Sequence, residues 1–279
     1  MIVVRTRTEL RDALAPRPRP HGVVPTMGWL HDGHRSLIRR AKADNATTIA
    51  TIFVNPRQFN EAADYQRYPR NEARDLQICE EEGVDLVFAP SVEEVYPPGF
   101  DTTVSVGAVA RPLEGAARPG HFDGVATVVA ILFDLVSAER AYFGQKDAQQ
   151  VMVIRQMARD LAIPTEVIAC PTVREPDGLA LSSRNVHLSP AERAAAPVLR
   201  RALLGARACW EGGERSGDAL RETMRDALAT EPLATPAYVS VADGSTLAEL
   251  DRVPDGGPVL LSLAVRFGPT RLIDNEPLP

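Results

Sequence analysis

Residues 23–34 read Val23-Val24-Pro25-Thr26-Met27-Gly28-Trp29-Leu30-His31-Asp32-Gly33-His34, an apolar run followed by a turn and two histidines. The run 23–27 is typical of a buried strand, and the residues after it are typical of a helix start. His31 and His34 are three residues apart, so they would lie on one face of the first helical turn. A helix start presents unpaired N–H groups and the positive end of the helix dipole, and phosphates bind there. The stretch therefore points to nucleotide chemistry.

A His-x-x-His pair also occurs in metal sites. Zinc normally takes three or four protein ligands, and no third candidate lies near His31 and His34 in the sequence. We therefore expect no metal bound by the protein itself. The role predicted for both imidazoles is to donate hydrogen bonds to phosphate oxygens as charge moves onto the leaving group.

Strands and helices alternate on both sides of this stretch, which predicts an α/β fold with a parallel sheet covered by helices on both faces. Polar segments follow three of the strands, at 25–34, 55–58 and 144–150. Ligands bind beyond the carboxyl ends of the strands in such sheets, so we expect these segments to meet at one edge. The expected strands are 1–4, 23–27, 47–54, 86–89, 140–143 and 165–169, and the expected helices are 36–43, 71–79 (capped by Asn71 and stopped by Gly83), 124–136 and 148–161.

The composition changes after about residue 173, which predicts two domains, 1–173 and 174–279. Ser189 and Pro190 begin an Ala/Arg-rich helix that the glycines at 212–213 end, and a second helix covers 218–229. Antiparallel strands are expected at 238–241, 259–267 and 271–273. We expect a small α+β domain packed over the edge of the first.

Composition excludes several classes of protein. The chain has 279 residues, 44% of them hydrophobic, and neither a secretion signal nor an apolar run of membrane-spanning length. A net charge of −6 argues against a general nucleic-acid-binding face. Cys79, Cys170 and Cys209 have no Cys-x-x-Cys spacing, so we expect no disulfide framework and a cytoplasmic location.

Further candidate residues each have a plainer alternative interpretation. In 144–147, Gly144 allows close backbone approach, Lys146 suits phosphates and Asp147 can cap a helix, although this is also ordinary turn composition. The segment 181–185 offers two hydroxyls and a guanidinium as a phosphate clamp, or forms a capped turn.

The neutral amides Gln58 and Gln150 would orient an attacking carboxylate without quenching its charge, or lie on the surface. Val125, Val128 and Val129 have helical spacing, which favours core packing and is compatible with an apolar pocket wall. The roles of Arg118 and His121, just ahead of that helix, stay open.

Taken together, these motifs resemble those of pantothenate synthetases (pantoate–β-alanine ligases). The blocks are in family order and cover nearly all of the first 190 or so residues, whereas the last ninety or so match only in general character. They are Pro25-Thr26-Met27-Gly28 with Leu30-His31-Asp32-Gly33-His34, Ile52-Phe53-Val54-Asn55-Pro56 with Gln58-Phe59, Tyr68-Pro69-Arg70, Leu113-Glu114-Gly115, Arg118-Pro119-Gly120-His121-Phe122, Phe143-Gly144, Lys146-Asp147, Gln149-Gln150 and Ser182-Ser183-Arg184-Asn185.

The resemblance implies a Rossmann-like ATP- and pantoate-binding domain over 1–173, a C-terminal lid domain over 174–279, and a homodimer formed through the N-terminal domains. It implies that D-pantoate is joined to β-alanine through a pantoyl adenylate, with release of AMP and pyrophosphate, on the route to pantothenate and coenzyme A. Mg²⁺ would be held mainly by the phosphates of ATP. The implied partners are these small molecules, with no nucleic acid and no membrane.

The resemblance also assigns site residues. His34 is the residue that the family marks as catalytic, and His31, Lys146, Ser182, Ser183 and Arg184 would join it in stabilising phosphate charge. ATP would be held by Met27, Gly28, Trp29, Leu30, His31, Asp32, Gly33, His34, Gly144, Gln145, Lys146, Asp147, Val173, Leu181, Ser182, Ser183 and Arg184. Pantoate would be held by Pro25, Thr26, Met27, Gln58, Val125, Val128, Val129 and Gln150, and β-alanine would share Gln58.

Three positions depart from the commonest family pattern: Trp29, Gln145 and Ala148. None removes a phosphate or substrate donor, so they affect only the packing expected around adenine and pantoate. Two other functions remain open. A nucleotidyltransferase would transfer AMP to a phosphate acceptor, which favours Arg or Lys over the glutamines. A nucleotide-sensing module without turnover leaves the histidines and the Ser-Ser-Arg segment unexplained.

Overall fold

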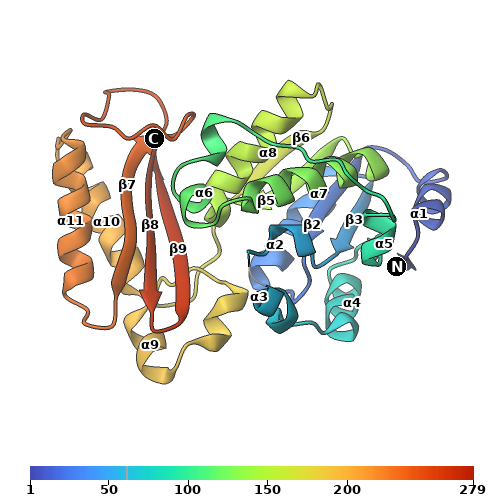
Figure 1. Ribbon diagram of the computed structural model, residues 1–279, viewed down its shortest axis with the longest axis horizontal. Coiled ribbons are helices and arrows are strands. Elements are labelled where there is room, and N and C mark those ends of the chain that lie inside the picture. The colour runs from blue at the N-terminus through green and yellow to red at the C-terminus, as the bar shows by residue number, and fades with distance from the viewer. Residues whose placement is uncertain (61) are drawn as a thin grey trace. The chain divides into compact units, whose positions relative to one another are not determined.

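The computed structural model describes residues 1–60 and 62–279, which divide into two compact units (Figure 1). One unit contains Met1–Gln145 and Gln149–Pro171, and the other contains Lys146–Ala148 and Thr172–Pro279. No helix among these residues combines the length and the apolar character needed to cross a membrane.

The first unit is built on a six-stranded sheet with the order β1-β4-β3-β2-β5-β6, and all of its pairings are parallel. The chain runs outward from β2 through β3 and β4 on one side, and continues through β5 and β6 on the other. The switch point of the sheet therefore lies between β2 and β5, where α/β proteins bind ligands. The strands are β1 (Ile2–Val4), β2 (His21–Thr26), β3 (Thr47–Ile52), β4 (Leu86–Phe88), β5 (Arg140–Gly144) and β6 (Glu166–Cys170).

Helices cover both faces of this sheet, so its strands are buried on both sides. Val23 and Ile49 belong to one hydrophobic cluster, whereas the next residues, Val24 and Ala50, belong to another. The helices α1 (Arg7–Leu14), α7 (His121–Val136) and α8 (Ala148–Asp160) contribute to the first cluster, and α2 (Asp32–Asp44) and α4 (Glu72–Glu81) to the second. Shorter elements are η1 (Pro56–Gln58), α3 (Ala62–Arg67), α5 (Val92–Val95), η2 (Ala108–Ala110), α6 (Glu114–Ala117) and η3 (Gln145–Asp147).

The second unit is α+β. An antiparallel sheet of order β7-β8-β9 packs on one face against α10 and α11, which lie side by side (Figure 1). Leu199, Leu203, Leu220 and Met224 of these helices are fully or almost fully buried. Both parts of the predicted fold class are thereby confirmed. The elements are η4 (Ser183–His187), α9 (Pro190–Ala195), α10 (Val198–Glu211), α11 (Gly217–Ala229), β7 (Thr235–Asp243), β8 (Val259–Phe267) and β9 (Thr270–Leu278).

Three predictions for the second unit were wrong in extent, and the first is the strand predicted over 238–241, which spans Thr235–Asp243 as β7. The helix predicted from Ser189 to the glycines at 212–213 is two helices, although Ser189 does cap the first in a capping box with Glu192. Pro197 has no N–H with which to continue α9, so the chain restarts there as α10. The strand predicted over 271–273 continues to Leu278, and it tolerates Pro277 because β9 is an edge strand.

Candidate active site

The turn between β2 and α2 is tightly constrained. The N–H of Gly28 donates to the hydroxyl of Thr26 (3.1 Å), which itself donates to the carbonyl of Thr51 on β3 (2.6 Å). Gly28 and Trp29 both have a left-handed backbone, with φ of 78° and 52°. The turn is therefore tied to the sheet, and Trp29 adopts a conformation that non-glycine residues take only where their surroundings impose it.

His31 and His34 cap the start of α2. His31 is the N-cap rather than the first helical residue, and its Nδ1 accepts the N–H of Gly33 (3.1 Å). The N–H of His31 donates to Nδ1 of His34 (3.3 Å), and the ring centroids lie 4.1 Å apart. Because Nδ1 accepts a backbone hydrogen in both rings, each neutral imidazole carries its proton on Nε2. Both histidines are thus set up as Nε2–H donors at a helix N-terminus.

A buried carboxylate that the sequence reasoning missed lies behind this turn. Asp75 of α4 is 1% exposed and accepts the N–H groups of Trp29 and Leu30, both at 2.8 Å. Next to it, the guanidinium of Arg74 lies 5.4 Å from the centroid of the Trp29 ring. One signal could have revealed Asp75: it shares a helix face with Ile78 and Cys79, so an acidic residue stands at a core position.

Gln58 follows β3 and has an oriented side chain. The Nδ2 of Asn55 donates to its Oε1 (3.0 Å), so the amide of Gln58 presents Nε2 as a donor elsewhere. Asn55 is held in turn, since its Oδ1 accepts the hydroxyl of Tyr96 (2.8 Å) and its Nδ2 also donates to the carbonyl of Gly124 (3.0 Å). Burial raises the pKa of Tyr96, which keeps its hydroxyl protonated as a donor.

Arg118 and His121 hold the backbone of Gln58. The Nδ1 of His121 donates to the carbonyl of Gln58 (2.9 Å), and Nη2 of Arg118 lies 3.3 Å from the same oxygen. Nη1 of Arg118 donates to Nε2 of His121 (3.0 Å), so the imidazole is neutral and bridges the two. These contacts give both residues, whose roles the sequence left open, a structural task beside a predicted substrate ligand.

The helix α7 packs closely against η1. An added Cβ at Gly124 would lie 2.2 Å from the carbonyl oxygen of Arg57, so this glycine permits the approach. Val125, Val128 and Val129 are all buried in the core, as their spacing predicted. Gln150, the third residue of α8, is half-buried.

The end of β5 offers room for a ligand. An added Cβ at Gly144 would have no neighbour within 4 Å among the described residues, in keeping with the close approach predicted there. Because β5 pairs with β2 in parallel, Gly144 and Gln145 leave the sheet at the edge where the β2–α2 turn begins. The first unit therefore has residues 25–34, 55–58 and 144–145 at one edge of its sheet, whereas Lys146–Ala148, the middle of the third predicted segment, belong to the second unit.

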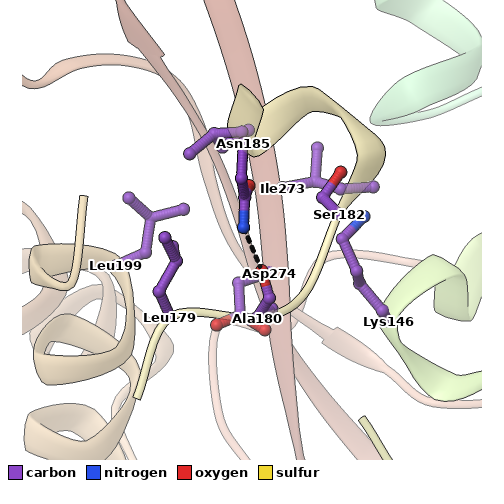
Figure 2. Close-up of a pocket in the computed structure, with 9 residues that line it drawn as sticks. Lys146, Leu179, Ala180, Ser182, Asn185, Leu199, Ile273 and Asp274 are labelled. Atoms are coloured by element: carbon purple, nitrogen blue, oxygen red, sulfur yellow. Dashed lines mark hydrogen bonds between the residues drawn. The ribbon is translucent and has the colours of Figure 1, made fainter. Parts of the chain in front are cut away.

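Predicted phosphate ligands also meet within the second unit. Lys146 and Ser182 line one small pocket with Asn185 and Asp274 (Figure 2). The carbonyl of Lys146 accepts the Nδ2 of Asn275 on β9 (2.9 Å). The pocket is completed by Leu179, Ala180, Leu199, Leu272 and Ile273.

The segment 181–185 is a capped turn whose ends are anchored. The hydroxyl of Ser182 accepts the N–H of Arg184 (3.3 Å) at the start of η4, and the Arg184 side chain is exposed. The N–H of Leu181 donates to the carbonyl of Val173 (3.0 Å), which joins two predicted ATP ligands. The plainer interpretation of this segment is therefore correct as local structure, and it leaves the guanidinium accessible.

Ion pairs hold the surroundings of this turn. Arg174 makes a bidentate pair with Asp274 (2.6 and 3.0 Å), and Arg193 pairs with Glu175 and Asp177 (2.5 and 2.6 Å). Among residues 1–60 and 62–279, no group of three or more His, Cys, Asp or Glu side chains is placed to hold a metal ion.

Comparison with known proteins decides the family. A family model described as pantoate–β-alanine ligase matches residues 2–277. The chain belongs to the pantoate–β-alanine ligase family. It is 60% identical over 275 residues to a pantothenate synthetase of Roseiflexus castenholzii, covering 99% of this chain and 98% of that protein.

Solved structures of this ligase family share the fold. The pantothenate synthetase of Thermus thermophilus superposes with a TM-score of 0.93 at 51% identity, covering 99% of each chain. A pantoate–β-alanine ligase of Francisella tularensis, complexed with β,γ-ATP and β-alanine, has a TM-score of 0.80 at 35% identity, covering 99% of this chain and 97% of that one.

Proposed function

We propose that this ligase condenses D-pantoate with β-alanine at the expense of ATP, releasing AMP and pyrophosphate and supplying pantothenate for coenzyme A synthesis. The observation that carries the proposal is the family match over residues 2–277. The pair of histidines capping α2 at the switch point of the sheet supports it, because this is where an ATP phosphate would meet preorganised donors.

In the first step, a carboxylate oxygen of pantoate attacks the α-phosphorus of ATP. A new P–O bond forms, the bond from the α-phosphorus to the bridging oxygen breaks, and pyrophosphate leaves with the bonding electrons. His34 and His31 would donate from Nε2 to phosphate oxygens as negative charge builds on them. Their Nδ1 atoms accept backbone hydrogens before ATP arrives, so little reorganisation is needed during the reaction.

The second unit would supply the remaining phosphate contacts. Lys146, Ser182, Ser183 and Arg184 are proposed to bind phosphates and residues 174–279 to act as a lid that keeps water from the adenylate. The rest of the proposed ATP site is Met27, Gly28, Trp29, Leu30, Asp32, Gly33, Gly144, Gln145, Asp147, Val173 and Leu181. We propose that Mg²⁺ arrives with the nucleotide and is held mainly by its phosphates.

In the second step, the amine of β-alanine attacks the acyl carbon of pantoyl adenylate. A C–N bond forms, the C–O bond to AMP breaks, and the nitrogen loses a proton. Gln58 and Gln150 would orient pantoate, Gln58 would also contact β-alanine, and Pro25, Thr26, Met27, Val125, Val128 and Val129 would line the pantoate pocket. The support for Gln58 is its fixed amide, whose Nε2 presents hydrogens to an acceptor.

We also propose a homodimer and a cytoplasmic location. The dimer rests on the family resemblance, and light scattering of the purified protein tests it. The location is supported by three free cysteines, of which Cys79 has a thiol pKa raised by burial to about 12 and is therefore unreactive.

Product analysis tests the reaction. Purified protein is incubated with D-pantoate, β-alanine and MgATP, and the products are quantified by mass spectrometry. The proposal requires pantothenate and AMP in equal amounts. ADP in place of AMP, or AMP attached to a phosphate-bearing acceptor, would contradict it.

A further inference from the structure

Asp75 is a buried carboxylate to which the proposed reaction gives no role. It contacts the backbone of the turn that leads to His31. Asp75 is 1% exposed, and a buried carboxylate is retained only where its oxygens are satisfied. Its Oδ2 accepts the N–H of Trp29 and its Oδ1 accepts the N–H of Leu30, both at 2.8 Å. The contact with the guanidinium of Arg74, through Nη1, is longer at 3.9 Å. Asp75 is thus bound chiefly to the backbone of the β2–α2 turn.

These two hydrogen bonds fix the peptide planes that lead directly into the N-cap. Charge-assisted bonds to a carboxylate are roughly twice as strong as neutral ones, so they can hold Trp29 at its positive φ. Leu30, fully buried, fills the core next to them. The next residue is His31, which enters the helix with an extended backbone and receives its hydrogen bond from Gly33.

The turn is shaped to receive the carboxylate. An added Cβ at Gly28 would lie 2.9 Å from Oδ2 of Asp75 and 3.3 Å from Cγ2 of Ile52. The glycine is therefore required for two reasons, its φ of 78° and the space that Asp75 occupies.

We propose that Asp75 is the positioning residue for the two histidines: it sets the path of residues 29 and 30 so that His31 and His34 meet ATP with both Nε2–H groups aimed at its phosphates. Asp75 itself touches neither substrate nor phosphate. The inference rests on the proposed function, because Asp75 is proposed to act on the adenylation step through His31 and His34.

A double-mutant cycle separates positioning from general stability. Asp75→Asn keeps the shape of the side chain but leaves only one acceptor oxygen for two N–H groups. The variant is made alone and together with His31→Ala and His34→Ala, and pantoate-dependent exchange of labelled pyrophosphate into ATP is measured alongside thermal unfolding. We expect Asp75→Asn alone to slow exchange on the order of 10- to 100-fold. In the background without histidines it should slow exchange by less than about threefold, since the groups it positions are gone.

The matched control is Asp85→Asn. The Oδ2 of Asp85 also accepts a backbone N–H, that of Thr48 (2.8 Å), and pairs with Lys42 (3.1 Å). It lies just before β4, at the opposite end of the strands from the histidines. Exchange by this variant should stay within about twofold of the parent, whatever its loss of stability.

The outcomes are distinct. If Asp75→Asn slows exchange by the same factor in the His31→Ala/His34→Ala protein as in the parent, the positioning role is overturned. Absence of exchange in the parent protein would instead contradict the proposed function. If Asp75→Asn does not fold, Asp75→Glu is taken through the same cycle with the same criterion, because it keeps the charge and both acceptor oxygens but displaces them from the N–H groups of Trp29 and Leu30.

Discussion

Two regions carry predicted phosphate ligands, and they are held in different ways. The turn between β2 and α2 is fixed by hydrogen bonds among buried groups, chiefly to Thr26 and Asp75. The turn that begins at Ser182 is a capped turn with an exposed Arg184 side chain, and its Asn185 donates to Glu175, which is ion-paired with Arg193. Buried hydrogen bonds fix a geometry before the ligand binds, whereas a flexible exposed guanidinium is ordered by the ligand. We infer that the first region stabilises the transition state and that the second mainly binds ATP.

The largest effect should come from the preorganised region. His34→Ala removes an Nε2–H donor and should lower kcat on the order of 10²–10³-fold while the protein stays folded. Steady-state kinetics and circular dichroism check this. His34→Asn is the more selective variant, because its Oδ1 can still accept the N–H of His31 while the Nε2 donor is lost. Recovery of near-normal turnover in His34→Asn would show that capping, and not donation to phosphate, is the function of His34.

Substitution in the exposed turn at 182–185 should have a smaller effect on catalysis, and the effect should be mainly on the KM for ATP. Arg184→Ala would remove the proposed charge-assisted hydrogen bonds to phosphate, and we expect kcat/KM for ATP to fall on the order of 10- to 100-fold. Most of the change should be in the KM for ATP, since these bonds form on binding, and the melting temperature should not move. A drop in kcat as large as that of His34→Ala, at unchanged KM, would remove the distinction between the two regions.

Gln58 tests whether preorganisation extends to the pantoate side. Gln58→Ala should raise the KM for pantoate on the order of tenfold and leave ATP affinity nearly unchanged. His121→Ala, which removes a hydrogen bond to the Gln58 carbonyl, should shift the same parameter by a smaller factor. Steady-state kinetics give the KM values, and isothermal titration with each ligand gives the affinities. Equal losses for pantoate and ATP would argue against this assignment.

The smallest effect concerns stability and its dependence on pH. Burial opposes ionisation of Glu276, but hydrogen bonds from Arg200 and Arg207 outweigh it and lower the pKa of this carboxyl group. A lowered folded-state pKa gives stability that is present above the unfolded-state value and is lost as the pH falls through the folded-state value. Glu276→Gln should therefore cost about 1–2 kcal/mol at pH 7.

This difference should shrink as the pH falls below about 4.5, the ordinary value for a glutamate. Denaturant unfolding of both proteins at several pH values measures it. A gap that is constant down to about pH 3 would mean that the charge of Glu276 contributes nothing.

The sequence predicted the parts of the fold that local pattern determines. Thr47–Ile52 and Arg140–Gly144 were found as strands because β-branched or apolar runs are buried on both faces, and Asn71 was found as a cap. The break at Pro197 was missed because the Ala/Arg-rich pattern continues on both sides of it. The end of β9 was missed because Asp274, Asn275 and Glu276 are polar and buried, and only tertiary partners make that favourable.

The sequence predicted the residues proposed to contact the substrates, but not the residues that hold them in place. His31, His34 and Gln58 lie in motifs with local chemical meaning. Asp75 lies 45 residues from Leu30 in the chain, and His121 lies 63 from Gln58, so neither contact leaves a local pattern in the sequence. Asp75 lies on α4 and His121 on α7, and each reaches its partner only when these helices pack against the assembled sheet.

Pyrophosphate exchange is the decisive measurement for the adenylation step. The protein is incubated with ATP, Mg²⁺ and labelled pyrophosphate, with and without D-pantoate, and with β-alanine absent. We predict that label enters ATP only when pantoate is present, because pantoyl adenylate forms reversibly before the amine arrives. Tight ATP binding with no pantoate-dependent exchange would contradict the two-step mechanism.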